Sequence, residues 1–233
     1  IVWGKFLNAG QTCIAPDYVF LPAGQENDFI AAARAVVAAS YPDLAQNPDY
    51  SAVVNTRHAS RLRSYLADAA AKGAQIIPLA EVPGKDGGPQ RLAPTLVVQP
   101  DDSMLIMQDE IFGPLLPIMT YQRIEDALIY INAHERPLAL YLFDHDKIRI
   151  EQILDNTVAG GVTINDTILH IAQDNLPFGG IGASGMGHYH GHEGFLTFSK
   201  LKPVFYQSRI NGMGLFNPPY GALFERLLKV LLR

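Results

Sequence analysis

Short apolar segments alternate regularly with amphipathic ones along most of this sequence. Runs rich in β-branched and aromatic side chains predict strands over 17–21, 74–78, 94–98, 115–121, 138–143 and 162–165. Apolar side chains at helical spacing predict helices over 25–39, 56–72, 124–134 and about 146–155. Apolar strands separated by helices predict an α/β fold, in which helices cover both faces of an open, mostly parallel sheet.

The rest of the chain divides into loops and a C-terminal arm. A loop rich in Gly and Pro is expected over 83–89, and from about Asn175 the sequence becomes Gly-rich and irregular. Order is expected to resume over 197–207 and in a C-terminal helix. We therefore expect one α/β domain over 1–196 and an arm over 197–233 that holds a strand and a terminal helix.

Composition excludes several classes of protein. A net charge of −5 provides no basic field for nucleic acid. No apolar run approaches the roughly 20 residues that span a bilayer, and no signal peptide is recognisable. A single cysteine cannot form an internal disulfide, which suits a reducing cytoplasm. Because the chain opens in the middle of an apolar pattern, we expect it to be part of a longer protein.

The single cysteine lies in the run Phe-Leu-Asn-Ala-Gly-Gln-Thr-Cys, which ends at Cys13. A lone cysteine is usually a small buried apolar residue. Here Ala9, Gly10 and Thr12 are small enough for a ligand to approach the backbone, and a predicted strand follows. A cysteine at such a boundary can present its thiol and its own backbone N–H to a carbonyl group. We therefore interpret Cys13 as a candidate nucleophile.

A second run, Gln-Asp-Glu-Ile-Phe-Gly-Pro over 108–114, precedes a predicted strand. It can be a plain turn with solvated acids. In the functional interpretation, Glu110 holds the hydroxyls of a polar ligand and Phe112 forms an aromatic wall beside it. These two residues are the candidates for a ligand site.

A third run, Pro-Phe-Gly-Gly-Ile-Gly-Ala-Ser-Gly-Met-Gly over 177–187, contains a formal G-x-G-x-x-G pattern. No buried strand leads into it, no helix clearly opens from it, and no acidic residue lies about 20 positions on. We therefore reject it as a dinucleotide fingerprint.

In this order and spacing, the three runs closely resemble the aldehyde dehydrogenase superfamily. The resemblance is nearest to its class 3-like and coniferyl aldehyde branch, through Trp-Gly-Lys-Phe, Arg-Pro-Leu-Ala-Leu-Tyr and Gly-Met-Gly-x-Tyr-His-Gly. It implies that the Cys13 thiolate attacks an aldehyde, that hydride passes to NAD or NADP, and that water hydrolyses the thioester. Glu110 matches the family glutamate that binds the nicotinamide ribose, and Phe112 matches the phenylalanine beside it.

The resemblance also implies that parts of the family's catalytic and cofactor-binding sites lie outside these residues. In this family the general-base glutamate, the oxyanion-hole asparagine and most of the cofactor-binding domain precede the nucleophile, so we expect this chain alone not to turn over. The substrate is expected to be an aromatic or medium-chain apolar aldehyde such as coniferyl aldehyde. The segment 201–207 matches the strand through which the family dimerises, so a homodimer is expected.

Other residues allow competing interpretations. His188, His190 and His192 would share a face if the segment were extended, but no further ligand completes a metal site, so no metal is predicted. Asn165 and His170 follow a predicted strand and are candidates for the substrate mouth, with a turn and a satisfied polar residue as the plainer interpretation. A Cys13–His170 pair would instead indicate a thiol hydrolase.

A non-catalytic module that forms oligomers is a further alternative to an enzyme. In the terminal helix, an apolar stripe is formed by Leu223, Phe224, Leu227, Leu228 and Leu231. We expect the stripe to dock on protein, beside the substrate mouth of a dimer partner. Binding to a membrane surface is less favoured, because three cations and one acid make a weak lipid anchor.

Overall fold

The computed structural model describes residues 1–81, 88 and 90–232 and divides the chain into two units, Ile1–Phe198 and Ser199–Arg233. This division falls two residues after the boundary expected from the sequence. The predicted loop over 83–89 lies outside the described residues, apart from residue 88.

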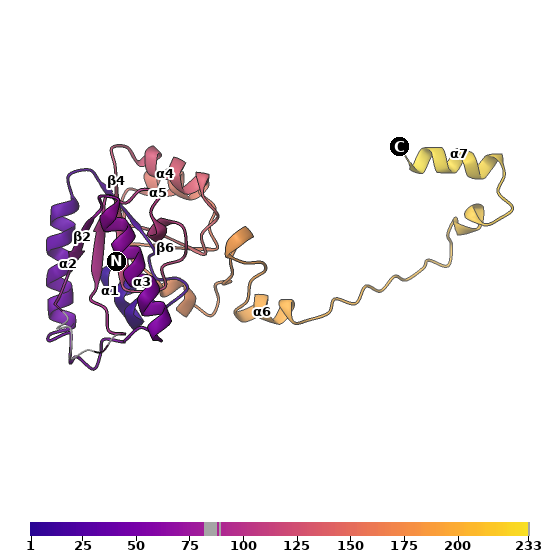
Figure 1. Ribbon diagram of the computed structural model, residues 1–233. Coiled ribbons are helices and arrows are strands. Elements are labelled where there is room, and N and C mark those ends of the chain that lie inside the picture. Colours follow the sequence, from indigo (N-terminus) through magenta and orange to yellow (C-terminus); the bar gives the residue numbers. More distant parts are fainter. Residues whose placement is uncertain (82–87, 89, 233) are drawn as a thin grey trace. The chain divides into compact units, whose positions relative to one another are not determined.

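The larger unit is built on a four-stranded sheet with the order β1-β4-β3-β2. Its strands are β1 (Val19–Pro22), β2 (Gln75–Pro78), β3 (Thr95–Val98) and β4 (Leu115–Tyr121). Two of these strands, β2 and β4, are labelled in Figure 1. Strands β1 and β3 run parallel to the central β4, and β2 pairs antiparallel with β3. All four residues of β3 are buried, as the continuous apolar run predicts for a strand covered on both faces.

Helices cover both faces of this sheet, because alternate strand residues point to opposite sides. On one face, Leu96 and Leu116 pack in a cluster with Ala33 and Val37 of α2 (Glu26–Ser40). On the other, Val97 packs in a cluster with the buried residues of α3 (Thr56–Ala71). The α/β architecture predicted from the sequence is therefore confirmed.

The last two strands, β5 (Ala139–Leu142) and β6 (Gly161–Ile164), form a separate parallel pair. Where one open sheet was expected, the described strands thus fall into two. No ladder joins β1 to β5 among the described residues, and residues of both strands line one cavity. The helices α4 (Ile124–Ala133) and α5 (Lys147–Asp155) complete this part of the fold.

Helix ends follow the expected chemistry. Asn55 caps α3 by accepting a hydrogen bond from the backbone N–H of His58 at 2.9 Å. After α3, Gly73 takes a φ of +96°, a left-handed conformation that favours glycine. Two short helices, α1 (Val2–Phe6) and α6 (Gly191–Thr197), were not predicted. Helix α6 forms despite Gly191 and Gly194, which lie in the segment that was expected to be irregular.

The smaller unit contains the terminal helix α7 (Ala222–Leu231), which confirms that a helix forms there. Residues 199–207 belong to no helix or strand, and the whole of 201–207 is exposed. Pairing of that segment with a second chain therefore stays a prediction. Within the described part of the chain, every helix is too short or too polar to cross a membrane.

Candidate active site

Cys13 is exposed on a tight turn between a short 3₁₀ segment and β1. The backbone N–H of Ala15 donates to the carbonyl of Thr12 at 3.1 Å, so Cys13 and Ile14 are the two central residues of a β-turn. The segment before the turn is unusual, because Asn8, Ala9 and Gly10 all have positive φ. The thiol is thus presented by a strongly bent backbone.

Gly10 explains how two of the sequence motifs meet. A Cβ on this residue would lie 2.2 Å from the carbonyl oxygen of Gly113, and its φ of +74° also favours glycine. Only a residue without a side chain allows the Cys13 segment to approach the Glu-Ile-Phe-Gly-Pro segment so closely. The spacing of small residues before Cys13 therefore has a structural cause, which is contact with the second motif.

Gln11 anchors the same segment. Its amide nitrogen donates to the carbonyls of Asn8 and Ala52, both at 3.0 Å, and its amide oxygen accepts from the N–H of Val54 at 2.8 Å. The glutamine two residues before Cys13 therefore ties the turn to a segment about 40 residues away.

Cys13, Glu110 and Phe112 line one cavity of about 940 Å³, together with Tyr141 and Thr167. The cavity extends between the edge strands β1 and β5. The nucleophile candidate and the two ligand-binding candidates predicted from the sequence thus lie around a shared space that is large enough for a small organic ligand.

Glu110 is held in place through its backbone. The Arg61 guanidinium donates to the carbonyl of Glu110 at 3.0 Å and to that of Ile111 at 2.6 Å. From the other side, the Asp17 carboxylate accepts from the N–H of Ile111 at 3.2 Å. Partial burial raises the pKa of the Glu110 carboxyl, and the nearby Asp17 charge raises it further. Its side chain remains exposed towards the cavity.

A buried charge lies next to this site. Lys5 is fully buried, its Nζ lies 4.0 Å from Asp17 Oδ1, and it has no hydrogen-bond partner among the described residues. Burial lowers the pKa of Lys5 to about 8. Lys5, Asp17 and Arg61 were not among the residues predicted from the sequence. A lysine inside the apolar run Ile-Val-Trp-Gly-Lys-Phe was the one available signal.

The Gly-rich loop over 177–187 packs closely on itself and on the residues that follow it. Phe178 and Tyr189 exchange both backbone hydrogen bonds, at 2.8 and 2.9 Å. A Cβ on Gly179 would lie 2.1 Å from the carbonyl oxygen of Gly187. The glycines therefore permit close packing within the loop, and a 3₁₀ turn over Gly182–Ser184 takes the place of the helix that a dinucleotide fingerprint requires.

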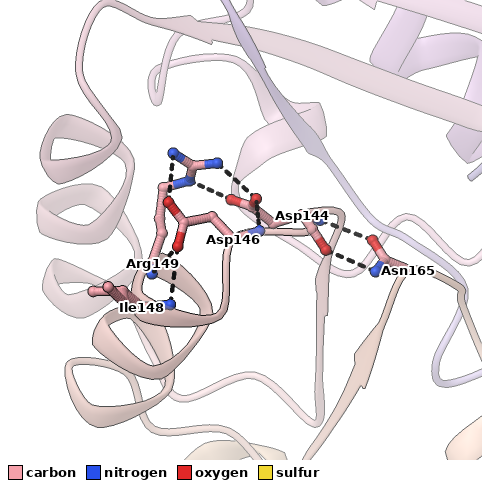
Figure 2. Close-up of polar contacts among 5 residues, drawn as sticks. All are labelled: Asp144, Asp146, Ile148, Arg149 and Asn165. Carbon is pink, nitrogen blue, oxygen red and sulfur yellow. Dashed lines mark hydrogen bonds and ion pairs between the residues drawn. The ribbon is translucent and has the colours of Figure 1, made fainter.

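Asn165 directly follows β6 and is hydrogen-bonded to Asp144, which lies two residues after β5; Figure 2 shows this pair. Its Oδ1 accepts from the N–H of Asp144 at 2.8 Å, and its Nδ2 donates to the carbonyl of Asp144 at 2.7 Å. The Asp144 carboxylate is paired with Arg149 in turn. Asn165 does not line the cavity that contains Cys13. The turn interpretation of Asn165 therefore accounts for its polar atoms, and its role at a substrate mouth stays untested.

His170 is buried, and its Nδ1 lies 2.9 Å from Thr163 Oγ1. Burial lowers the pKa of its imidazole. His170 does not line the cavity, and no hydrogen bond joins it to Cys13 among the described residues. The thiol-hydrolase alternative thus has no contact to support it.

The histidines near residue 190 do not form the extended row on which the metal interpretation depended. His192 lies in α6, His190 has a φ of +88°, and His188 pairs with Glu193 at 3.0 Å. Because a helix and a bend replace the strand, the three rings do not share one face. The described residues contain no group of three metal-binding side chains placed to hold an ion.

Comparisons with known proteins agree with the motifs. A family model described as the aldehyde dehydrogenase family matches residues 1–204. The chain is 52% identical over 228 residues to the probable coniferyl aldehyde dehydrogenase of Pseudomonas aeruginosa, and this match covers 98% of the chain and 47% of that protein. It is 43% identical to aldehyde dehydrogenase family 3 member A2 of Mus musculus, over 87% of the chain and 40% of that protein.

The fold is also similar to that of a solved aldehyde dehydrogenase-like structure. The solved structure of Staphylococcus aureus AldH in a substrate-bound state superposes with a TM-score of 0.79 at 38% identity. The superposition covers 99% of this chain and 49% of that structure. The chain thus spans about half the length of the curated relatives that it matches.

Proposed function

The chain belongs to the aldehyde dehydrogenase family, in the branch of class 3 and coniferyl aldehyde dehydrogenases, and on that premise we propose that it provides the nucleophile for NAD(P)-dependent oxidation of an aldehyde. The observation that carries the proposal is the shared cavity, in which Cys13, Glu110 and Phe112 meet. The approach of Gly10 to Gly113 brings these residues together.

In the proposed reaction, the Cys13 thiolate forms a bond to the aldehyde carbon, and the carbonyl electrons move onto the oxygen. The backbone N–H of Cys13 is one donor to this oxyanion, because the bent turn presents the thiol and the amide together. Loss of hydride from the carbon gives a thioester on Cys13. Water then adds to the thioester, releases the carboxylic acid and returns the thiol.

The residues present fit a nicotinamide cofactor at the other wall of the cavity. Glu110 offers a carboxylate to ribose hydroxyls, and its backbone is fixed by Arg61 and Asp17. Phe112 is 37% exposed and offers a ring beside it. When bound, NAD or NADP supplies the acceptor for the hydride.

We further propose an aromatic or medium-chain apolar aldehyde as substrate, because relatives named as coniferyl aldehyde dehydrogenases are similar to this chain. A homodimer through 201–207 is supported by the exposure of that apolar segment. Action in the cytoplasm is supported by the single unpaired thiol.

A chimera tests the proposal. The part of the Pseudomonas aeruginosa relative that precedes its match to this chain is joined before residue 1, and NAD(P)H formation is measured with coniferyl aldehyde. We expect turnover by the chimera, none after Cys13→Ser, and none by the 233 residues alone. Turnover by the Cys13→Ser chimera would contradict the nucleophile assignment. A folded but inactive chimera would favour the non-catalytic module.

A further inference from the structure

Tyr141, which the proposed reaction does not use, contacts the segment that holds the nucleophile. Its hydroxyl donates to the carbonyl oxygen of Ile14 at 2.6 Å, across 127 positions of sequence. Ile14 directly follows Cys13, and Tyr141 lines the same cavity. The second sheet therefore holds the nucleophile turn through a side chain rather than through a β-ladder.

This hydrogen bond is the second one to the peptide group between Ile14 and Ala15. The N–H of Ala15 is already bonded to Thr12 across the turn, and the carbonyl of Ile14 belongs to the same peptide group. With Tyr141 bound to that carbonyl, both polar atoms of the plane that follows Cys13–Ile14 have partners. Because a peptide group is rigid, holding both ends of it leaves the turn little freedom to rotate.

Tyr141 is itself supported from its own sheet. Its register partner in β6 is Thr163, so the two side chains project from the same face. Thr163 Oγ1 contacts His170 Nδ1 at 2.9 Å, and the His170 ring lies 6.1 Å from the Tyr141 ring. Gly161 makes room for that imidazole, because a Cβ there would lie 2.8 Å from His170 Cδ2.

The hydroxyl keeps its proton over the range in which thiols react. Burial raises the pKa of Tyr141 to about 12; a backbone hydrogen bond with Ile168 lowers this pKa, and the charge of Cys13 raises it. Tyr141 thus stays a hydrogen-bond donor at neutral pH, and its phenol lies close enough to Cys13 for their charges to interact.

We propose that Tyr141 is a positioning residue, whose hydroxyl fixes the Cys13 turn against the second sheet while Thr163 and His170 hold the tyrosine ring. His170 then acts through Tyr141 rather than by contact with the thiol. The expected effect on catalysis rests on the proposed function, whereas the expected effect on the mobility of the Cys13 turn does not. A fixed turn keeps the thiol in the orientation from which it attacks a carbonyl.

The first test uses the 233-residue chain itself. Cys13 is its single cysteine, so a nitroxide spin label attached through a thiol reports on this turn alone. Tyr141→Phe removes one hydroxyl, and we expect the label's spectrum to show a clear gain in mobility at temperatures well below unfolding. The matched control is Tyr50→Phe, which also removes a hydroxyl bonded to a backbone carbonyl, that of Leu92 at 2.8 Å. We expect the control to leave the spectrum as in the parent chain.

A second variant keeps the proposal testable if Tyr141→Phe does not fold. Thr163→Val keeps the Tyr141 hydroxyl and removes the partner of His170, and we expect an intermediate gain in label mobility. Circular dichroism establishes that each variant is folded. Identical spectra for the parent chain, Tyr141→Phe and Thr163→Val would overturn the proposal, and so would an equal gain in mobility for Tyr50→Phe.

In the active chimera, we expect Tyr141→Phe to lower kcat by about fivefold to tenfold, as the loss of one hydrogen bond predicts. The KM for the cofactor should stay unchanged. A merely structural defect would lower the fraction of active protein and would not mobilise the label in the folded chain. If the chimera has no activity while the label responds as expected, the proposed function fails and the positioning role stands.

Discussion

Replacing Lys5 by methionine should stabilise this chain, because a buried ammonium without a hydrogen-bond partner is costly. Lys5 is fully buried, and its contact with Asp17 at 4.0 Å is too long for a hydrogen bond. The pKa of Lys5 falls from 10.5 to about 8 on folding. At about 1.4 kcal/mol for each tenfold change in proton affinity, keeping the proton costs about 3 kcal/mol. Attraction to Asp17 is already included, because it acts on the same pKa.

The sign of the pH dependence follows from linkage. Between pH 8 and 10.5 the unfolded chain keeps the Lys5 proton and the folded chain loses it, so the free energy of unfolding rises with pH. Below about pH 8 the full cost is present. Lys5→Met should therefore gain about 3 kcal/mol at neutral pH, and this gain should shrink steadily above pH 8.

Urea denaturation followed by circular dichroism at neutral pH and at about pH 9.5 measures both effects. Tyrosines begin to ionise in the unfolded chain near the higher pH, but they are the same in the parent chain and in the variant, so their effect cancels in the difference between the two. Lys202→Met, at an exposed lysine, is the matched control and should change little at either pH. If Lys5→Met is less stable than the parent chain at neutral pH, or if its gain does not depend on pH, the buried ammonium has a partner and the reasoning is wrong.

Three further predictions concern the site and the arm. Glu110→Gln in the active chimera should raise the activation free energy of hydride transfer by about 1–3 kcal/mol, while acylation of Cys13 by an activated ester survives. The control Glu125→Gln, at an exposed residue, should have no effect; a parallel loss of both activities in Glu110→Gln would contradict a role of Glu110 in cofactor binding. Gly10→Ala should lower the free energy of unfolding by about 2 kcal/mol or more, because its Cβ meets the Gly113 carbonyl at positive φ; an unchanged urea midpoint would contradict that contact. Deleting 218–233 should alter the KM for bulky aldehydes or the stability of a dimer, with cofactor affinity unchanged; loss of binding to anionic vesicles with unaltered kinetics would favour the membrane alternative.

Local patterns predicted most of the secondary structure, because apolar periodicity reports directly on which side chains are buried. The strand β4 lies at the predicted residues, and α3 ends before the glycine that was expected to follow it. Patterns were less informative near residue 190. There His190 enters the left-handed region and α6 begins at the next residue, a local choice that composition does not reveal.

Candidate site residues could be predicted from the sequence where the chemistry depends on the residue type. Residues that act through tertiary contacts could not be predicted in this way. Cys13 and Glu110 were selected as candidates from their motifs, and both line one cavity in the structure. The roles of Arg61 and Tyr141 depend on backbone carbonyls that lie 49 and 127 positions away. Every residue type has the same backbone carbonyl, so the sequence does not indicate which of them accepts a side-chain hydrogen bond. Asn165 was interpreted as a possible ligand-binding residue because it follows a strand, but its amide is already bonded to the backbone of Asp144.

The central claim is that Cys13 becomes covalently acylated by the aldehyde. The most direct test is mass spectrometry of the active chimera, quenched rapidly after mixing with coniferyl aldehyde and NAD(P), followed by mapping of the modified peptide. We expect an acyl group on the peptide that contains Cys13, formed together with NAD(P)H and absent after Cys13→Ser. Oxidation of the aldehyde at an unchanged rate by the Cys13→Ser chimera, with no acyl group on that peptide, would contradict it.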